Sequence, residues 1–377
     1  VMASTDKELS FIVEDLYVDD AVDMLEELPA NVVDKILMRT DKETRKLINQ
    51  FLNYPESSAG SLMTIDYIGL KKEMTVGKAL SYIKVHGMDQ ETVYTCYVMD
   101  SQRHLEGIVS LRTLVVSDDE EEIEDLMHED FISVNVMDDR EDVAQLFQKY
   151  DYLALPVVDK ENRLVGIITF DDIMDVIEEE NTEDFERMAG VFDDSDKDYF
   201  NLSVGQHIKN RLPWLLLMSV SLMITGAILT RFEALLSQVI SLVSYLPLLM
   251  GTGGNSGSQA ATLIIRGMTV GDVELKDAGK VLWKEIRISF IIGLVLSALN
   301  FAKILFLDGQ PVLIALTVCS ALLSVVMFAK VLGGMLPMAA KKLGIDPALM
   351  ATPLISSITD MVSALLYFIL ASLILGL

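Results

Sequence analysis

Two polar stretches inside apolar runs contain the side chains that could do chemistry. The first is 247-PLLMGTGGNSGSQAAT-262, in which Asn255 and Gln259 stand four residues apart and therefore share one face of a helix. The second is 352-TPLISSITD-360, which ends in Asp360, the only acidic or basic residue of the C-terminal apolar run. Carboxylate, amide, hydroxyl and carbonyl oxygens without His or Cys suit a hard cation such as Mg²⁺ or Ca²⁺. The two stretches therefore predict a site for a divalent cation.

The surroundings of these stretches indicate a membrane pore. A glycine-rich segment with apolar flanks must line a cavity or pack against protein, because lipid cannot satisfy its backbone groups. Close helix packing is the alternative, but it does not account for Asn and Gln among four glycines. We expect the helix to open at the glycines and expose carbonyl oxygens. The predicted pore ligands are Asp360, Asn255, Gly251, Gln259, Thr359 and Ser356.

A carboxylate within a membrane span needs a partner or a water-filled path. The candidate basic partners of Asp360 are Lys303 and Lys330, which the sequence places near span ends. A water-filled path is therefore the better expectation. Mg²⁺ loses its water reluctantly, so the path would hold it largely hydrated. One Asp per chain is little for a divalent ion, and a homodimer with a shared pore would supply two.

The elements that must position these residues fall in two halves of opposite character. Residues 1–210 contain 48 acidic and 19 basic residues, whereas residues 211–377 contain 8 and 11. Five apolar segments of the second half are long enough to cross a bilayer. They run over residues 213–230, 235–265, 286–307, 312–338 and 348–377. The apolar segments come last, so no cleavable N-terminal signal is expected.

The distribution of Lys and Arg predicts the orientation of this membrane half. Basic residues precede the first span and occupy the loops between spans two and three and between spans four and five. The opposite loops offer little besides Arg231. By the positive-inside rule the N-terminal half is cytoplasmic and the C-terminus lies outside, in a multi-pass protein of the plasma membrane in contact with lipid. The excess of acid argues against nucleic-acid binding.

The acidic half contains an internal repeat. Residues 62–70 match 126–134, and 98-VMDSQRHLEGIVSLRTLV-115 matches 157-VVDKENRLVGIITFDDIM-174. Each copy predicts helix, strand, turn, strand and helix, and the shared pattern resembles the CBS domain, two of which form a Bateman module. Residues 8–53 predict three short helices. The expected fold class is an α-helical transmembrane bundle with a cytoplasmic α/β tandem CBS module and a short all-α N-terminal segment.

Runs of carboxylates in this half predict a regulatory cation site. Such a surface repels itself unless cations bind between its parts. Loose carboxylate clusters hold divalent ions at roughly 10⁻⁴–10⁻³ M, a range suited to sensing cytosolic Mg²⁺. The predicted regulatory ligands are Asp138, Asp139, Asp142, Asp171, Asp172, Asp175, Glu178, Glu179, Glu183 and Asp184.

The resemblance to CBS domains also raises nucleotide binding. Such modules often hold a ribose with a Ser/Thr-x-x-Asp element. The second copy offers Thr169 and Asp172, whereas the first has Ser110 followed by Thr113. ATP as a regulator therefore stays an open expectation, with Thr169, Asp172 and Ser110 as the candidate residues.

The whole chain resembles the MgtE family of Mg²⁺ channels and transporters. The most specific matches are the two stretches at 247–262 and 352–360. The resemblance implies a homodimer whose second and fifth spans form the pore, with Asp360 as the pore aspartate and Asn255 as its polar partner. It also implies a gating plug helix near 180–205. The N-terminal segment departs from the family pattern because the family's helical N-domain is roughly twice as long.

Five regions follow from these patterns. They are a shortened N-domain (1–57), CBS 1 (58–125), CBS 2 (126–179), an acidic connecting or plug helix (180–208) and the pore domain (209–377). The expected function is Mg²⁺ import down its electrochemical gradient, closed when cytosolic Mg²⁺ binds the acidic CBS and plug region.

Other functions are weighed against this expectation. A nucleotide-sensing membrane receptor or scaffold, and a broader transporter of Mn²⁺ or Co²⁺, remain alternatives. Five spans and an acidic pore residue argue against a chloride channel. The sequence lacks a P-loop, a nucleophile–base pair and an HExxH motif, so no enzyme is expected. The Gly-Met-Asn signature of CorA-type transporters is also absent.

Overall fold

The computed structural model describes residues 13, 16–26, 28–192, 199–350 and 352–376, which fall into two compact units divided between Glu180 and Asn181. The first unit begins with the short helices α2 (Val18–Glu26), α3 (Ala30–Arg39) and α4 (Lys42–Phe51), as predicted. Their apolar faces share a core with the second repeat, in which Leu25 and Phe51 join Phe147 and Ile173. The N-terminal segment therefore packs on the repeat instead of forming a core of its own.

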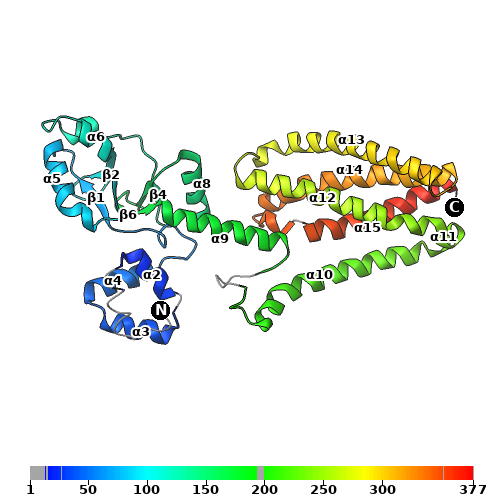
Figure 1. The fold of residues 1–377 in the computed structure, drawn as a ribbon, viewed down its shortest axis with the longest axis horizontal. Coiled ribbons are helices and arrows are strands. Elements are labelled where there is room, and N and C mark those ends of the chain that lie inside the picture. Colours follow the sequence, from blue (N-terminus) through cyan, green and yellow to red (C-terminus); the bar gives the residue numbers. More distant parts are fainter. Residues whose placement is uncertain (1–12, 14–15, 27, 193–198, 351, 377) are drawn as a thin grey trace. The chain divides into compact units, whose positions relative to one another are not determined.

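The internal repeat forms two sheets of the same topology, which confirms the predicted tandem CBS module (Figure 1). In each sheet the first two strands pair in parallel and the last two are antiparallel. The first copy comprises β1 (Tyr67–Leu70), α5 (Val76–His86), η1 (Gly87–Asp89), β2 (Thr92–Met99), β3 (Leu105–Ser110), α6 (Leu111–Val116) and α7 (Ile123–Leu126). The second comprises β4 (Val134–Asn135), α8 (Arg140–Tyr150), β5 (Ala154–Val158), β6 (Leu164–Thr169) and α9 (Phe170–Met188).

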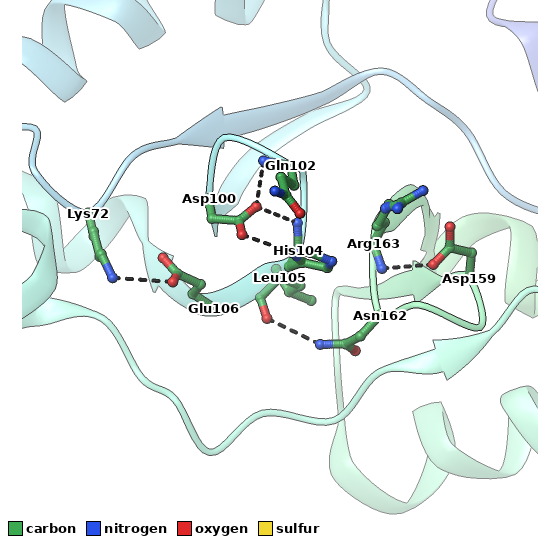
Figure 2. Close-up of polar contacts among 9 residues, drawn as sticks. All are labelled: Lys72, Asp100, Gln102, His104, Leu105, Glu106, Asp159, Asn162 and Arg163. Carbon is green, nitrogen blue, oxygen red and sulfur yellow. Dashed lines mark hydrogen bonds and ion pairs between the residues drawn. The ribbon is translucent and has the colours of Figure 1, made fainter.

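The repeated aspartates, Asp100 and Asp159, close the turns between the antiparallel strands (Figure 2). In each turn one carboxylate oxygen accepts hydrogen bonds from the backbone N–H groups two and four residues later, at 2.7–2.9 Å. Arg103 and Asn162 occupy equivalent left-handed positions, with φ of 69° and 61°. The repeated Asp is therefore a turn-forming residue, which explains its place in the motif.

The two turns also pair with each other across the repeat. The Leu105 N–H donates to the Asn162 carbonyl at 3.1 Å, and the Leu164 N–H donates to the Arg103 carbonyl at 2.9 Å. The Asn162 side chain donates in addition to the Leu105 carbonyl (Figure 2). These reciprocal bonds join the two copies into one module.

The expected connecting helix over residues 180–208 is interrupted near Gly190, within the stretch 190–194 at which the sequence left a break open. Helix α9 ends at Met188, and Gly190 follows in the left-handed region with φ of 73°. A glycine in this conformation is a common helix terminator. The next helix, α10 (Val204–Arg231), starts afresh with Ser203 and Gln206 in a capping box.

Four helices of the second unit are long and apolar enough to cross a membrane, counting only the residues the structure describes. They are α10, α13 (Ala278–Phe306, preceded by η3, Leu275–Asp277), α14 (Val312–Lys342) and α15 (Thr352–Leu375, preceded by η4, Pro347–Met350). The helix α12 (Leu246–Thr269) contains the glycine-rich stretch and packs against α14 and α15 (Figure 1). The short elements α11 (Glu233–Gln238) and η2 (Ile240–Tyr245) account for the excess length of the expected second span. This arrangement is consistent with five spans.

The glycine-rich stretch forms a continuous helix, so the expected opening of the backbone is wrong. Gly253, Gly254 and Gly257 are buried where α14 and α15 approach. A Cβ on Gly253 or Gly257 would stand 2.6 Å from a methyl carbon of α15, and one on Gly333 of α14 would overlap the Gly257 carbonyl oxygen. Helix packing therefore explains these three glycines. It does not explain Gly251, which has open space beside it.

Candidate functional site

One face of α12 is polar and exposed in the single chain. Gly251, Asn255 and Gln259 recur every four residues on this face, whereas Ser256 and Gly257 are buried against the neighbouring helices. We call these three residues the α12 polar face. Amide groups pointing into lipid would be costly, because lipid offers no hydrogen bonds. The α12 polar face must therefore meet water or another protein surface.

Three predicted pore residues belong to α15, and the structure places them differently. Asp360 and Ser356 are partly exposed, and Ser356 Oγ would stand 3.1 Å from a Cβ on Gly254. Thr359 is fully buried against Gly253, and its hydroxyl has no hydrogen-bond partner among the described residues. Asp360 and Ser356 are thus accessible, whereas Thr359 lies within the α12–α15 contact and off the exposed surface.

Neither candidate base neutralises Asp360 in the part of the chain that the structure describes. Lys303 pairs with Asp308 at 2.6 Å. The sequence placed Lys330 near a span end, but the structure does not place it near a solvated helix end. It is 5% exposed, and its ammonium lies 3.5 Å from the Ser256 carbonyl. Asp360 is therefore a partly exposed carboxylate that neither of these two bases neutralises.

The end of α9 contacts the helices that carry the predicted pore residues. Met188 packs against Ala261 and Ile265 of α12 and Ile355 of α15. Arg187, next to it, forms ion pairs with Glu183 and with Asp346, which lies just before η4 and α15. The last turn of α9 is therefore joined to both α12 and the approach to α15.

The segment after α9 is held on α10 and is not a free linker. The Phe192 N–H donates to the Asn210 carbonyl at 3.0 Å, and the Phe192 ring packs edge-on against Trp214. A Cβ on Gly190 would overlap the Trp214 indole. The described residues that follow α9 are therefore packed against the start of α10.

The predicted regulatory carboxylates lie at the start of α8 and along α9. Asp138 and Asp139 accept backbone hydrogen bonds at 2.7 and 2.9 Å, so both shape the turn into α8. Glu179 pairs with Arg140 at 2.9 Å, as does Glu180. No three His, Cys, Asp or Glu side chains are close enough to hold a metal ion, as far as the described residues go. A regulatory ion would need further oxygens from water, a rearrangement or a second chain.

A carboxylate patch forms where the first repeat meets the start of α9. Its members are Asp66, Glu91, Asp171 and Asp172, with Asp20 nearby. Burial, and then the charges of Asp172 and Asp171, raise the pKa of Glu91 to about 7. Burial is also the main cause that raises the pKa of Asp172, with Thr169 acting in the opposite sense as a hydrogen-bond donor. These carboxylates therefore repel one another, although no three of them, among the described residues, are close enough to hold a metal ion as they stand.

The predicted nucleotide residues make separate contacts. Thr169 is buried and donates to Asp172 within the carboxylate patch. Ser110 caps α6, where its hydroxyl accepts from the Thr113 N–H at 3.0 Å. Ser110 also lines a cavity of about 320 Å³ together with Arg112 and Tyr152. That volume is in the range of small-molecule sites.

Three family models match the chain. A divalent cation transporter model named MgtE matches residues 246–370, the MgtE intracellular N domain matches 1–57, and a CBS domain matches 123–179. The magnesium transporter MgtE of Thermus thermophilus is 39% identical over 335 residues, which cover 89% of this chain and 74% of that protein. The MgtE of Bacillus subtilis is 34% identical over 355 residues, covering 94% and 78%.

The chain belongs to the MgtE family of magnesium transporters. MgtE proteins are membrane transporters and not enzymes, in agreement with the sequence. Among solved structures, the soluble part of a magnesium transporter is 40% identical, covering 45% of this chain and 67% of that one with a TM-score of 0.45. The cytosolic domain of the Mg²⁺ channel MgtE in complex with ATP is 38% identical, covering 45% and 69% with a TM-score of 0.43.

Sequence reasoning missed several charged residues of this MgtE chain. Arg140 and Arg187 are embedded in acidic runs, where a single base attracts no attention, although each neutralises carboxylates. Glu91 and Asp66 flank strands and resemble ordinary surface acids until the fold brings them to α9. Lys330 is a candidate partner of Asp360 in the sequence, placed near a span end, whereas the structure buries it within α14 beside the α12 backbone.

Proposed function

We propose that this chain forms a Mg²⁺-selective channel that imports Mg²⁺ down its electrochemical gradient. The α12 polar face is the observation that carries the proposal, because an exposed amide-bearing face on a membrane helix needs water or a partner. Asp360, on the adjacent helix α15, adds a carboxylate with no basic neighbour in an ion pair among the described residues. A homodimer that joins two such faces would have a wet path lined by oxygens and by two carboxylates.

The chemistry of the path favours a hydrated hard cation. Amide and carboxylate oxygens can accept hydrogen bonds from the water shell of Mg²⁺, so the ion need not be stripped. The named relatives are magnesium transporters, which supports Mg²⁺ as the substrate. We place the N-terminal unit in the cytoplasm and the C-terminus outside, because basic residues gather in the loops on the cytoplasmic side.

Closure by cytosolic Mg²⁺ is the regulatory part of the proposal. The end of α9 contacts α12 and α15 through Met188 and reaches the start of η4 through Arg187. The opposite end of α9 begins in the carboxylate patch. Binding of Mg²⁺ there would remove repulsion and hold α9 in place. Loss of Mg²⁺ would release α9 and open the path.

Divalent-cation flux into proteoliposomes tests the pore. Asp360→Asn should reduce Mg²⁺ flux at least about tenfold, because a fixed charge in a low-dielectric site interacts strongly with a divalent ion. The matched control is Glu233→Gln, an exposed carboxylate at the start of α11, which should leave flux unchanged. Full flux in Asp360→Asn would contradict the pore assignment. Equal flux of Mn²⁺ or Co²⁺ would replace Mg²⁺ selectivity with broader transport, and no flux of any ion would favour a receptor or scaffold.

ATP regulation is a second candidate, supported by the cavity that Ser110, Arg112 and Tyr152 line. An aromatic ring for the base and a guanidinium for phosphate suit a nucleotide. The test is equilibrium binding of ATP to the full chain, with Arg112→Gln expected to weaken it about tenfold. Undiminished binding in that variant would remove this cavity as the nucleotide site.

A further inference from the structure

The membrane half buries two side chains of opposite charge that the proposed path does not use. Lys330 of α14 is 5% exposed and Glu285 of α13 is 8% exposed. The Lys330 ammonium is 3.5 Å from the backbone carbonyl oxygen of Ser256, inside the glycine-rich part of α12. Charges within apolar helices are costly and are retained only where they have a partner or a function.

Two adjacent glycines of α14 explain how Lys330 reaches both neighbouring helices. A Cβ on Gly333 would overlap the Gly257 carbonyl oxygen of α12, so this side of α14 lies directly on α12. A Cβ on Gly334 would stand 3.1 Å from Glu285 Cγ, so the next side faces α13. Lys330 precedes these glycines by three and four residues and shares a face with each. It therefore lies between the α12 backbone and Glu285.

Glu285 is the counter-charge of this arrangement. Lys330 and Lys284 are the bases that act electrostatically on its carboxylate. Ser256 is buried, whereas its neighbour Asn255 is exposed, so Lys330 approaches α12 from the side away from the α12 polar face. One helix diameter, about 10 Å, then separates the ammonium from an ion on that face. At this distance an uncancelled positive charge would oppose a divalent cation.

We propose that Glu285 and Lys330 are a charge-balanced positioning pair that sets the affinity of the α12 path for divalent cations. Lys330 fixes the α12 backbone at Ser256, and Glu285 cancels the field that this ammonium would otherwise project onto the path. The inference rests on the proposed Mg²⁺ path along α12. It adds that two residues on the side of α12 opposite the α12 polar face set the affinity of the path, although they do not touch the ion.

The test is the concentration dependence of Mg²⁺ flux in proteoliposomes at one fixed pH. Glu285→Gln leaves the ammonium uncancelled and should raise the apparent KM for Mg²⁺ about tenfold, with the maximal flux per folded protein little changed. Lys330→Met removes the positive charge, so its KM should equal or fall below that of the unaltered chain. The double variant, which lacks both charges, should have a KM within about twofold of that of the unaltered chain. Glu285→Asp keeps the charge and should keep KM within about twofold.

Several outcomes separate this inference from simple helix bracing. A brace would lower the thermal stability and the maximal flux, whereas electrostatic tuning raises KM in Glu285→Gln and leaves it equal or lower in Lys330→Met. Equal increases of KM in both variants, or a double variant as poor as Glu285→Gln, would overturn the proposal. Lys303→Gln, which removes a base paired with Asp308, is the matched control and should leave KM unchanged.

The same assay distinguishes failure of the pair from failure of the path. If the unaltered chain passes no Mg²⁺, the proposed function fails and takes the inference with it. If the unaltered chain passes Mg²⁺ and Asp360→Asn does not, but Glu285→Gln has an unchanged KM, only the charge-balanced pair is wrong.

Discussion

The two ends of α9 hold their carboxylates in opposite ways. At the first end, Asp171 and Asp172 face Glu91 in the carboxylate patch, where each charge opposes the others. At the second end, Arg187 neutralises Glu183 and Asp346 together. The total acidity of the cytoplasmic half therefore does not locate a cation site. At the first end the main charges acting on Glu91 are other carboxylates, whereas the second end contains its own arginine.

This difference assigns separate tasks to the two ends under the proposed function. A divalent ion can lower the energy of the carboxylate patch by removing repulsion and desolvation. At the second end it would have to displace a guanidinium that already makes charge-assisted bonds, which brings little gain. We therefore expect the first end to sense Mg²⁺ and the second end to transmit the result to α12 and α15.

Removing the arginine should abolish the difference and give the largest effect. In Arg187→Gln, Glu183 and Asp346 lose their positive partner and become available to a divalent ion. The internal Mg²⁺ concentration that half-closes the channel should fall about tenfold. The reason is that the removed guanidinium charge no longer competes with Mg²⁺ for the two carboxylates. Flux into proteoliposomes with varied internal Mg²⁺ measures this midpoint.

Arg187→Lys is the control for that variant, because it keeps the charge and loses only the forked geometry. Its midpoint should stay within about twofold of the unaltered chain. A higher midpoint in Arg187→Gln would contradict the comparison, because it would mean that Arg187 itself holds the closed state.

Neutralising one acid of the first end should have a smaller and opposite effect. Glu91→Gln reduces the charge of the carboxylate patch, so the Mg²⁺ midpoint for closure should rise about threefold. Thermal stability without Mg²⁺ should increase at the same time, because a repulsive charge is gone. Glu129→Gln, an exposed acid outside the patch, is the control. A midpoint that does not move in Glu91→Gln would exclude the patch as the sensor.

Protonation of Glu91 should give the smallest effect. Its pKa of about 7 lies above its ordinary value of 4.5, so the folded state holds the proton more strongly than the unfolded state. The stability from this group is fully present below pH 4.5 and is lost as the pH rises through about 7. From pH 8 to pH 6 the folded chain without Mg²⁺ should gain about 1 kcal/mol after allowance for solvent screening.

The same pH change should weaken closure, because the protonated patch attracts Mg²⁺ less. The Mg²⁺ midpoint should rise about twofold between pH 8 and pH 6. Glu91→Gln should show neither change. A pH response of equal size in that variant would assign it to another group.

The sequence predicted the parts of this molecule that periodic patterns encode. The repeat with its turn-forming Asp100 and Asp159, the short N-terminal helices and the apolar spans follow from local patterns. The state of the glycine-rich stretch could not be predicted, because opening and close packing both require small residues. Packing prevails for Gly257, whose carbonyl lies against Gly333, a residue far away in the chain.

The residues of the candidate site likewise fall into those that local spacing predicts and those that depend on contacts between distant helices. Spacing alone placed Asn255 and Gln259 on one face, since four residues separate neighbours on a helix, and the structure adds Gly251 to that face. Spacing could not reveal that Thr359 faces inward or that Lys330 reaches the α12 backbone. Those facts depend on which helices meet, and contacts between distant segments leave no trace in local periodicity.

The contact of Gly333 with Gly257 limits how the proposed pore can widen. At this contact the α12 backbone lies against the α14 backbone, and no side chain between them could rotate to make room. We therefore expect α12 and α14 to move together as a rigid body. A change in the diameter of the proposed pore must then come from other elements, through tilting of α15 or separation of two protomers. A bulky ligand would find no space between α12 and α14. A ligand that binds between two protomers could instead change the distance between them and so the pore diameter.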